Sequence, residues 1–315
     1  MEQIKQRLLN DDNLADQYRA LFTLKAVGDK RAIDAIYEAI QKSSSALLKH
    51  ELAYVLGQIG DTYALPLLNN ILQDTQQDVM VRHEAAESLG AISSLDSLDI
   101  LRKYAAMTDL DVSIKETCDI SIKKIEFDHR EGKATDGDNE DNKIPVIDPA
   151  PATKSTDVSA NNVEELRGVY LNDTLPLFER YRAMFGLRNI VLNTPASHDS
   201  HAAALNSIAD GFGDKSALFR HEVAYVFGQI DSPAAIPALL KVLYDDKEHE
   251  MVRHEAAETL GGLGAESKEA KDALLDFAKN MDAPKVIRDS CIVALDMLAH
   301  EQSGAFQYAD GLEKA

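Results

Sequence analysis

The sequence predicts an all-α protein, built as a solenoid of helical hairpins with two halves of four hairpins each. Three observations support this fold class. Hydrophobic residues make up 45% of the 315 residues, whereas aromatic residues make up only 6% and Trp is absent, which is typical of helices packed on helices. Apolar positions recur at helical spacing, as in residues 64–73. The third observation is an internal repeat on two length scales.

Two motifs recur in each half of the chain. Residues 49–61 (KHELAYVLGQIGD) match 220–232 (RHEVAYVFGQIDS), and residues 81–92 (VRHEAAESLGAI) match 252–263 (VRHEAAETLGGL). Both matches are offset by 171 residues, and the two motifs of one half lie 33 residues apart. Such a short period is typical of two-helix repeats, which must stack into a solenoid because one hairpin cannot bury its apolar face alone.

The repeat divides the first half into hairpins near residues 1–29, 30–61, 62–92 and 93–127. The first hairpin contains YRALF at 18–22, which recurs as YRAMF at 181–185 with an offset of 163. The second and third hairpins carry the two motifs, and the fourth carries Cys118, whose counterpart is Cys291. The larger offset of the motifs predicts about eight additional residues in the second half, in the loop around Asn193 to His201, where Pro195 disfavours helix.

Residues 128–162 interrupt the repeat. They are polar and rich in Asp, Asn, Ser, Thr and Pro, so we expect a flexible linker between domains 1–127 and 163–315. The linker has eight acidic and four basic residues, whereas the net charge of the chain is −20, so most of the acidity belongs to the folded halves. This charge disfavours nucleic acid or an anionic membrane as a partner and favours a cationic partner.

The cysteines and the N-terminus indicate the compartment. Cys118 and Cys291 are too few and too far apart for a disulfide framework, and we interpret both as core thiols. The N-terminus has no apolar signal segment, and no stretch reaches the roughly 18 apolar residues of a membrane span. We therefore expect a soluble, cytoplasmic and monomeric protein, for which a nuclear presence is also compatible.

Four glycines recur with the motifs. Gly57, Gly90, Gly228 and Gly261 each lie seven residues after a repeated His, which is two helical turns. Either they permit close approach of neighbouring helices, or they mark the ends of helices. The sequence leaves both interpretations open.

Four His-Glu pairs occupy equivalent positions in the two central hairpins of each half: His50-Glu51, His83-Glu84, His221-Glu222 and His254-Glu255. Consecutive helical residues differ by about 100° in direction, so both can reach one broad face. Stacked repeats place equivalent positions side by side, and all four pairs converge if the two halves face each other. Because buried carboxylates repel, we predict that metal cations neutralise them, as two irons that each take two His and one Glu, with two Glu left over.

A structural consensus of the repeat is the alternative explanation of the pairs. The imidazoles would then pack, and the carboxylates would pair with the preceding bases Lys49, Arg82, Arg220 and Arg253. A packing consensus should extend to the flanking hairpins, which lack the pair, so this alternative is disfavoured. Two further His-Glu pairs begin at His249 and His300, outside the repeated position, and we interpret these histidines as surface residues.

Further residues lie one turn from the repeated histidines. Tyr54 and Tyr225 follow His50 and His221 by four residues, and either hydrogen-bond a ligand Glu or simply pack. The equivalent acidic residues after the other two histidines either accept from an imidazole or pair with a base of a neighbouring repeat; they are Glu87 and Glu258. Two methionines either line the cleft or fill the core, namely Met80 and Met251.

On these motifs the chain resembles the deoxyhypusine hydroxylase family, in which two sets of four HEAT-type repeats are joined by a variable linker. The resemblance covers nearly the whole chain outside 128–162, and all four His-Glu motifs are intact. It implies an iron- and oxygen-dependent monooxygenase that hydroxylates the deoxyhypusine side chain on the precursor of translation initiation factor five-A. It also implies that the eight residues of the four pairs bind two Fe2+ ions.

The two classes of carboxylate are expected to differ in role. We predict that Glu84 and Glu255 bind iron, whereas Glu51 and Glu222 are the catalytic carboxylates, which face the substrate amine or support the ligands. A function from another class stays open at this point. Solenoids of this type also serve as non-enzymatic scaffolds, and related repeats occur in bilin-lyase-like binding proteins, neither of which requires a metal.

Overall fold

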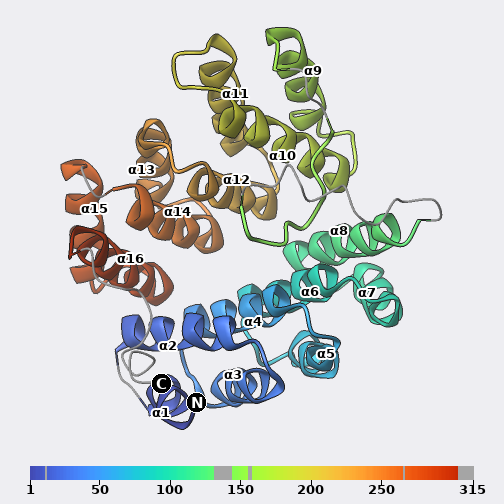
Figure 1. Cartoon of the computed structure of the whole chain (residues 1–315), viewed down its shortest axis with the longest axis vertical. Helices are drawn as coiled ribbons and strands as arrows, with labels where there is room; N and C mark the ends of the chain where they lie inside the picture. The colour runs from blue at the N-terminus through green and yellow to red at the C-terminus, as the bar shows by residue number, and fades with distance from the viewer. Residues whose placement is uncertain (11–12, 131–143, 155–157, 265–266, 304–315) are drawn as a thin grey trace.

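The predicted all-α solenoid is confirmed. The computed structural model describes residues 1–10, 13–130, 144–154, 158–264 and 267–303, and all regular elements in these ranges are helices (Figure 1). Each hairpin consists of an outer helix followed by an inner helix, and the inner helices line the centre of a ring. The residues of the predicted linker at 131–143 and 155–157 lie outside the described ranges.

The first half contains four hairpins in the predicted places. Its outer helices are α1 (Glu2–Asn10), α3 (Lys30–Lys42), α5 (Leu65–Gln73) and α7 (Leu98–Ala105). Its inner helices are α2 (Leu14–Val27), α4 (Ala46–Ile59), α6 (Val79–Ile92) and α8 (Val112–Asp128). Short 3₁₀ helices precede two of the outer helices, η1 (Thr62–Ala64) and η2 (Leu95–Ser97).

The second half repeats this order. Its outer helices are α9 (Ala160–Tyr170), α11 (Asp199–Asp210), α13 (Ile236–Tyr244) and α15 (Lys268–Lys279). Its inner helices are α10 (Leu177–Asn193), α12 (Ala217–Ile230), α14 (Glu250–Leu263) and α16 (Lys285–Ser303). The 3₁₀ helices are η3 (Gly211–Gly213) and η4 (Pro233–Ala235). The additional residues of this half lie partly in the predicted loop, at 194–198, and partly in η3, which has no counterpart between α3 and α4.

The helix caps place the His-Glu pairs. The Ser45 side chain accepts a hydrogen bond from the backbone N–H of Leu48 at the start of α4, and the helix ends at Gly60, whose φ of 74° suits glycine. In α14 the exposed side chain of His249 caps the helix by accepting from the N–H of Met251. The prediction that His249 is a surface residue is therefore confirmed. Each repeated His lies in the second turn after such a cap.

The recurring glycines allow inner helices to touch. A Cβ atom on Gly57 would lie 2.7 Å from Cα of Ser88 on the next inner helix, and one on Gly261 would lie 2.7 Å from Cα of Ala294. At the first crossing, the Ser88 hydroxyl donates to the carbonyl of Ala53 at 2.8 Å. All four glycines lie inside their helices, so the close-approach interpretation is confirmed and the helix-end interpretation is wrong.

Two adjacent glycines of α14 provide a test of this packing. We expect Gly261→Ala to lower the free energy of unfolding by about 1–3 kcal/mol, because the new methyl group overpacks the contact with α16. In contrast, no atom of the described residues outside the backbone of α14 itself lies within 4 Å of a Cβ on Gly262, so Gly262→Ala should raise it by about 0.5–1 kcal/mol through helix propensity. Denaturant unfolding measures both, and equal effects of the two substitutions would contradict the account.

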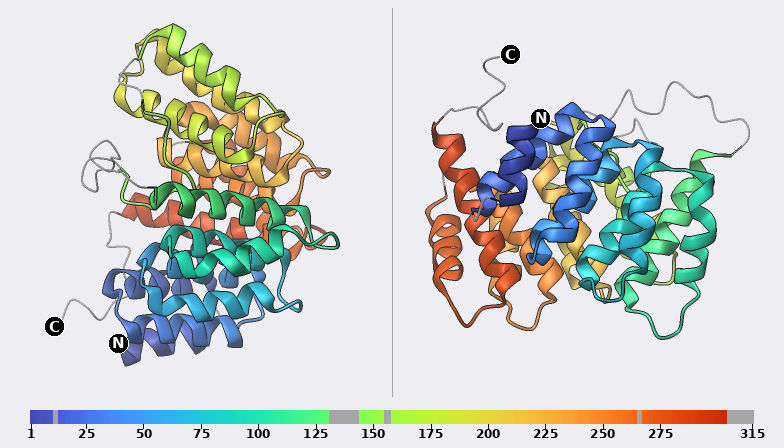
Figure 2. Two further views of the ribbon diagram at one scale, coloured as in Figure 1. Left: turned by 90° about the vertical axis from the view of Figure 1, so that its right-hand side faces the viewer. Right: turned by 90° about the horizontal axis from the view of Figure 1, so that it is seen from below.

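The two halves contact each other at both ends of the ring. At one end α2 lies beside α16, where Arg19 pairs with Asp296. At the other end α8 lies beside α10 and α12, where the Ser216 hydroxyl donates to Glu116 at 2.7 Å. Figure 2 shows the same arrangement from the side and from below, with the inner helices of each half packed side by side. The ring therefore brings the central inner helices of both halves face to face.

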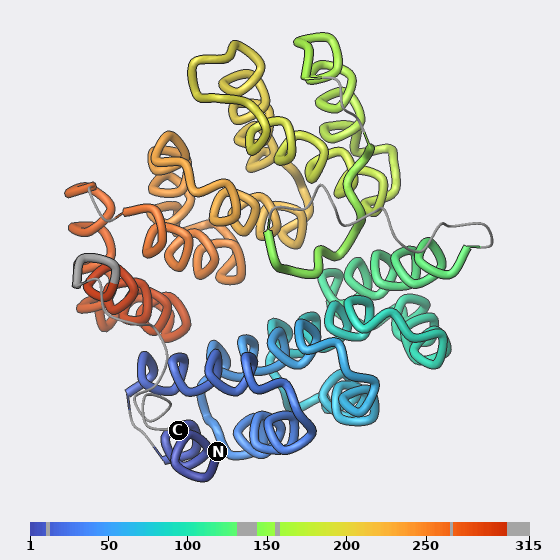
Figure 3. The backbone as a smooth tube through the Cα atoms, in the orientation of Figure 1, coloured from blue at the N-terminus to red at the C-terminus, as the bar shows by residue number. Residues whose placement is uncertain are grey.

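Part of the predicted linker is packed, which corrects the expectation of a flexible segment throughout 128–162. Residues 144–154 run between the two halves before the chain reaches α9 (Figure 3). Ile147 exchanges two backbone hydrogen bonds with the side chain of Gln58, and Asp148 forms a buried ion pair with Arg188. Ala150 belongs to the hydrophobic core. The polar composition of the segment gave no indication of this packing, because most hydrogen bonds of the segment involve its backbone or one buried ion pair.

Two further findings concern the length of the helices and the core. None of the helices that the structure describes is long and apolar enough to cross a membrane. Cys118 and Cys291 are free and buried in inner helices, as predicted, and burial raises the pKa of both thiols to about 12. Met80 and Met251 are buried in the hydrophobic core.

Candidate metal centre

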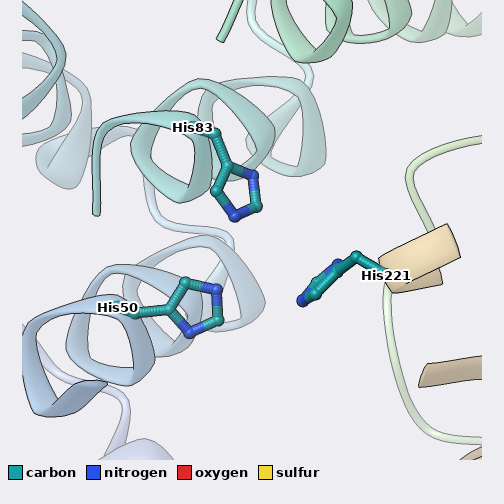
Figure 4. Close-up of side chains that lie close together, drawn as sticks. All are labelled: His50, His83 and His221. Atoms are coloured by element: carbon teal, nitrogen blue, oxygen red, sulfur yellow. The ribbon is translucent and has the colours of Figure 1, made fainter. Parts of the chain in front are cut away.

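The four repeated histidines converge at the centre of the ring. His50 comes from α4, His83 from α6, His221 from α12 and His254 from α14. Ring centroids lie 5.4 Å apart for His50 and His83, 5.3 Å for His221 and His254, and 5.1 Å for His50 and His254. Figure 4 shows three of these rings pointing toward one another from opposite halves. The convergence expected from the repeat is therefore present.

The four paired glutamates are buried in the same place. All eight side chains of the pairs belong to residues that are at most 8% exposed. Nε2 of His50 lies 3.2 Å from Oε2 of Glu84, and Nε2 of His221 lies 3.4 Å from Oε2 of Glu255. These pairs of atoms lack the geometry of a hydrogen bond. Each half thus brings one carboxylate against an imidazole of the preceding inner helix.

The bases that precede the histidines are engaged elsewhere. Arg82 donates to the carbonyl of Leu72, and Arg253 donates to the equivalent carbonyl of Leu243. These two arginines therefore join the inner helix to the outer helix of the same hairpin. The other two bases bind side chains of the next hairpin, with Lys49 on Gln77 and Arg220 on Glu248. The bases that the structural-consensus explanation required are thus directed away from the buried carboxylates.

Burial shifts the pKa values of the site in a consistent direction. Loss of solvation raises the pKa of Glu84 to about 8 and that of Glu51 to about 7, and neighbouring carboxylates add to the rise. The pKa of Glu222 is raised well above its ordinary value for the same reason. Burial also lowers the pKa of His83 and His254 well below the ordinary value. Without a metal, burial therefore favours the neutral acid form of Glu51, Glu84 and Glu222 and the neutral imidazole of His83 and His254.

The imidazole nitrogens are the strongest indication of a bound group. Both ring nitrogens of all four histidines are buried, and none has a hydrogen-bond partner among the described residues. Buried polar atoms are rarely left in this state, because each loses its hydration without compensation. Neutral imidazole is also the form that ligates metals. Three sets of potential ligand atoms lie within 4.8 Å of one another: His50, His83, His221; His221, His254, Glu255; and His83, Glu84, Glu87. The residues present therefore fit a metal centre with nitrogen and oxygen ligands.

The pKa shifts predict how the metal-free protein responds to pH. A carboxyl group whose pKa is raised on folding stabilises the fold below its ordinary value of 4.5, and this stabilisation is lost as the pH rises through the folded value. A histidine whose pKa is lowered stabilises the fold above 6.5 and loses this as the pH falls. Between pH 4.5 and 6.5, a rise in pH lowers the stability through the carboxyl groups and increases it through the histidines. From about pH 6.5 to 8, only the loss of stability from the carboxyl groups remains.

We therefore expect the metal-free protein to lose stability between pH 6.5 and 8, by roughly 1 kcal/mol per pH unit for one such carboxyl. Metal affinity should rise over the same interval, because a metal replaces the protons of its ligands. Denaturant unfolding with and without metal measures both effects. Glu84→Gln should reduce the change of the unfolding free energy with pH in the metal-free protein. An unchanged pH dependence in this variant would contradict the assignment.

Of the alternatives for the residues one turn further along, the hydrogen bond from a tyrosine to a ligand glutamate is not formed, whereas Tyr54 packs against the core. The hydroxyl groups of Tyr54 and Tyr225 hydrogen-bond each other at 3.0 Å across the two halves, rather than a ligand glutamate. Glu258 lies 3.9 Å from Nδ1 of His254 and accepts a hydrogen bond from Tyr18 of the other half at 3.4 Å. Burial raises the pKa of Glu87 to about 8. The shell around the histidines is therefore shared between the halves.

Some residues around the site were not predicted. Tyr18 belongs to a recognised repeat, but its bond to Glu258 depends on how the ends of the ring meet. Gln58 and Gln229 are equivalent residues in the two copies of the first motif, at 49–61 and 220–232. This recurrence was the available signal for the contacts that they make with residues 147–148. His300 was predicted to be a surface residue, but it is half-buried near the end of α16 and its Nε2 atom is buried, so this prediction is wrong.

Comparisons with known proteins agree with this architecture. A family model described as HEAT repeats matches residues 1–79, 38–115 and 203–296. The deoxyhypusine hydroxylase of Cryptococcus neoformans is 46% identical, covering 96% of this chain and 86% of that protein. The deoxyhypusine hydroxylase of Schizosaccharomyces pombe is 45% identical, covering 98% of this chain and 94% of that protein.

A solved structure shows the same relationship. The structure of human deoxyhypusine hydroxylase in complex with glycerol superposes with a TM-score of 0.83 and 42% sequence identity, and the match covers 95% of this chain and 96% of the human chain. The similarity thus extends over both halves, including the four inner helices that carry the His-Glu pairs. This chain belongs to the deoxyhypusine hydroxylase family.

Proposed function

We propose that the protein hydroxylates the deoxyhypusine side chain of the precursor of translation initiation factor five-A, using molecular oxygen at a centre of two Fe2+ ions. Family membership supports the reaction. The single observation that carries the metal centre is the set of buried imidazole nitrogens that have no hydrogen-bond partner among the residues that the structure describes. Histidine with carboxylate is the ligand set typical of non-haem iron that activates oxygen.

The ligand set that we propose consists of the four histidines with Glu84 and Glu255. Both carboxylates lie against a histidine of a neighbouring inner helix, and both belong to groups of potential ligand atoms. Glu51 and Glu222 belong to none of the groups found in the described part of the chain. They are therefore the two carboxylates left over, available for the substrate.

The roles of the protein groups follow from this division. When bound, iron would activate molecular oxygen, which is the oxidant: one oxygen atom enters the C–H bond and the other leaves as water, with two electrons from an external reductant. The inner helices hold the ligands on rigid elements and exclude water from the centre. Glu51 and Glu222 bind the ammonium group of the substrate arm, which holds the C–H bond to be hydroxylated in a fixed position beside the metal ligands. Burial raises the pKa of both carboxyl groups, and the charge of the ammonium group would oppose this rise and favour the ionised form that pairs with it.

The proposed partner is a protein that presents a basic side chain. The chain carries 53 acidic and 33 basic residues, and this surplus attracts a cationic surface and steers its approach. We further propose that the protein acts as a monomer, because the candidate ligands all come from one chain, and that it works in the cytoplasm.

A matched pair of substitutions tests the division of roles. We expect Glu51→Gln to keep both irons but to raise KM for the substrate at least about tenfold, because a charged partner of the ammonium group is lost. Glu84→Gln should instead lower the iron content and kcat. Iron analysis and steady-state kinetics of both variants provide the measurement. Loss of all iron from Glu51→Gln would contradict the assignment.

The reaction itself is tested by incubating the protein with deoxyhypusine-containing precursor in air and under anaerobic conditions. We expect hypusine to form only in air and only in the iron-loaded protein. A non-enzymatic scaffold or a bilin-lyase-like protein is not favoured, because neither requires unpaired buried imidazoles. Formation of hypusine without oxygen or iron would overturn the proposal, as would its absence under all conditions.

A further inference from the structure

The contact between α4 and α12 is organised as three rungs. On α4 the residues at successive spacings of four are His50, Tyr54 and Gln58, which places them on one side of the helix. The equivalent residues of α12 are His221, Tyr225 and Gln229. The first rung is the histidine pair, whose ring centroids lie 6.1 Å apart, and the second is the tyrosine pair with its 3.0 Å hydrogen bond.

The third rung includes the chain segment 147–148, which lies between the two glutamines. Gln58 donates to the carbonyl of Ile147 at 3.0 Å and accepts from its N–H at 2.9 Å. On the other side, Gln229 donates to Asp148 at 3.1 Å. The segment therefore joins α4 to α12 through two consecutive residues.

A buried charge fixes the segment on the second half. Arg188 of α10 donates to Asp148 at 2.9 Å and to Gln229 at 2.7 Å, and its side chain is 1% exposed. Further along, the N–H of Thr153 donates to the carbonyl of Arg182 at 2.9 Å. A buried ion pair whose hydrogen bonds are satisfied has one well-defined geometry. The pair of Asp148 with Arg188 therefore fixes the position of the segment.

We propose that residues 147–148 form a spacer that sets the separation of α4 and α12, and thereby holds His50 at the distance from His221 that the two irons of the proposed centre require. This inference rests on the proposed metal centre and deepens it. Gln58, Asp148, Arg188 and Gln229 are positioning residues, since they act through the helices rather than on the metal. The segment between the two halves is thus a part of the site, not only a covalent connection.

The test compares Asp148→Asn with Asp214→Asn. Asp214 forms a buried ion pair with Arg180 inside the second half, and the side chains of both aspartates are 8% exposed. Both substitutions should lower the melting temperature by a similar amount. Only Asp148→Asn should weaken binding of ferrous iron at least about tenfold in anaerobic titration of the full-length metal-free protein, and change the iron–iron distance measured by X-ray absorption.

A second variant keeps the test decisive if Asp148→Asn does not fold. Gln58→Ala removes the two hydrogen bonds to Ile147 without unpairing a buried charge, and it should weaken iron binding in the same direction. Iron affinity equal to that of the wild-type protein in the spacer variants would overturn the inference, as would an equal loss in Asp214→Asn. Failure of the wild-type protein to bind iron would instead overturn the proposed function.

Discussion

Replacing His83 with alanine is expected to remove iron and to lower the rate of hydroxylation about a thousandfold or more. The reason is that His83 is fully buried and that, within the described part of the chain, its ring has no hydrogen-bond partner and belongs to two of the three groups of potential ligand atoms. Loss of metal-assisted stabilisation worth several kcal/mol corresponds to a rate loss of roughly this size. Iron analysis and turnover of the purified variant provide the measurement.

The equivalent substitution and a surface control sharpen this prediction. His254→Ala should behave like His83→Ala, because the two residues are related by the 171-residue offset and are equally buried. His249→Asn is the control, since asparagine preserves the helix cap and the residue lies outside the centre. Retention of two irons by either buried-histidine variant would contradict the ligand assignment.

Removing the metal is expected to lower the stability of the whole ring. A ligand that binds only the folded state stabilises it by about 4 kcal/mol when its concentration exceeds Kd a thousandfold. A metal at the proposed centre would also balance the charge of the buried carboxylates, whose ionised form is disfavoured by burial and by the neighbouring carboxylates. We expect chelation to lower the melting temperature by roughly 10 °C, using the usual relation between free energy and melting temperature.

The comparison requires a control for effects of the chelator itself. A variant that binds no iron, such as His83→Ala, should melt at the same temperature with and without chelator. Equal melting temperatures of metal-loaded and metal-free wild-type protein would show that the metal does not contribute to the fold. In that case the contacts between α2 and α16 and between α8 and α12 would be sufficient to hold the ring closed.

The sequence predicted the parts of the molecule that repeat. The motifs around His50, His83, His221 and His254 have regular spacing, and a stacked array converts such spacing directly into proximity. For this reason the four inner helices and the convergence of the histidines could be predicted. The glycines were recognised too, although only the observed contact of Gly57 with Ser88 decided between their two possible roles.

The parts that the sequence did not predict depend on contacts between the halves. The hydrogen bonds between Tyr54 and Tyr225 and between Tyr18 and Glu258 form only because the ring closes, and no period within one half encodes that closure. The segment around Asp148 has the composition of a linker, and its order comes from a single buried ion pair and backbone hydrogen bonds. A periodic sequence pattern predicts the repeated hairpins, but it does not predict the structure of a unique segment that packs between them.

The most direct test of the metal centre is the iron content of the purified protein, determined on the same sample whose hydroxylation of the deoxyhypusine-containing precursor is measured. The account predicts two irons per chain, with activity that appears in proportion to iron as the metal-free protein is reloaded. Full activity in a protein that contains no iron, or two bound irons in a variant that lacks all four histidines, would contradict it.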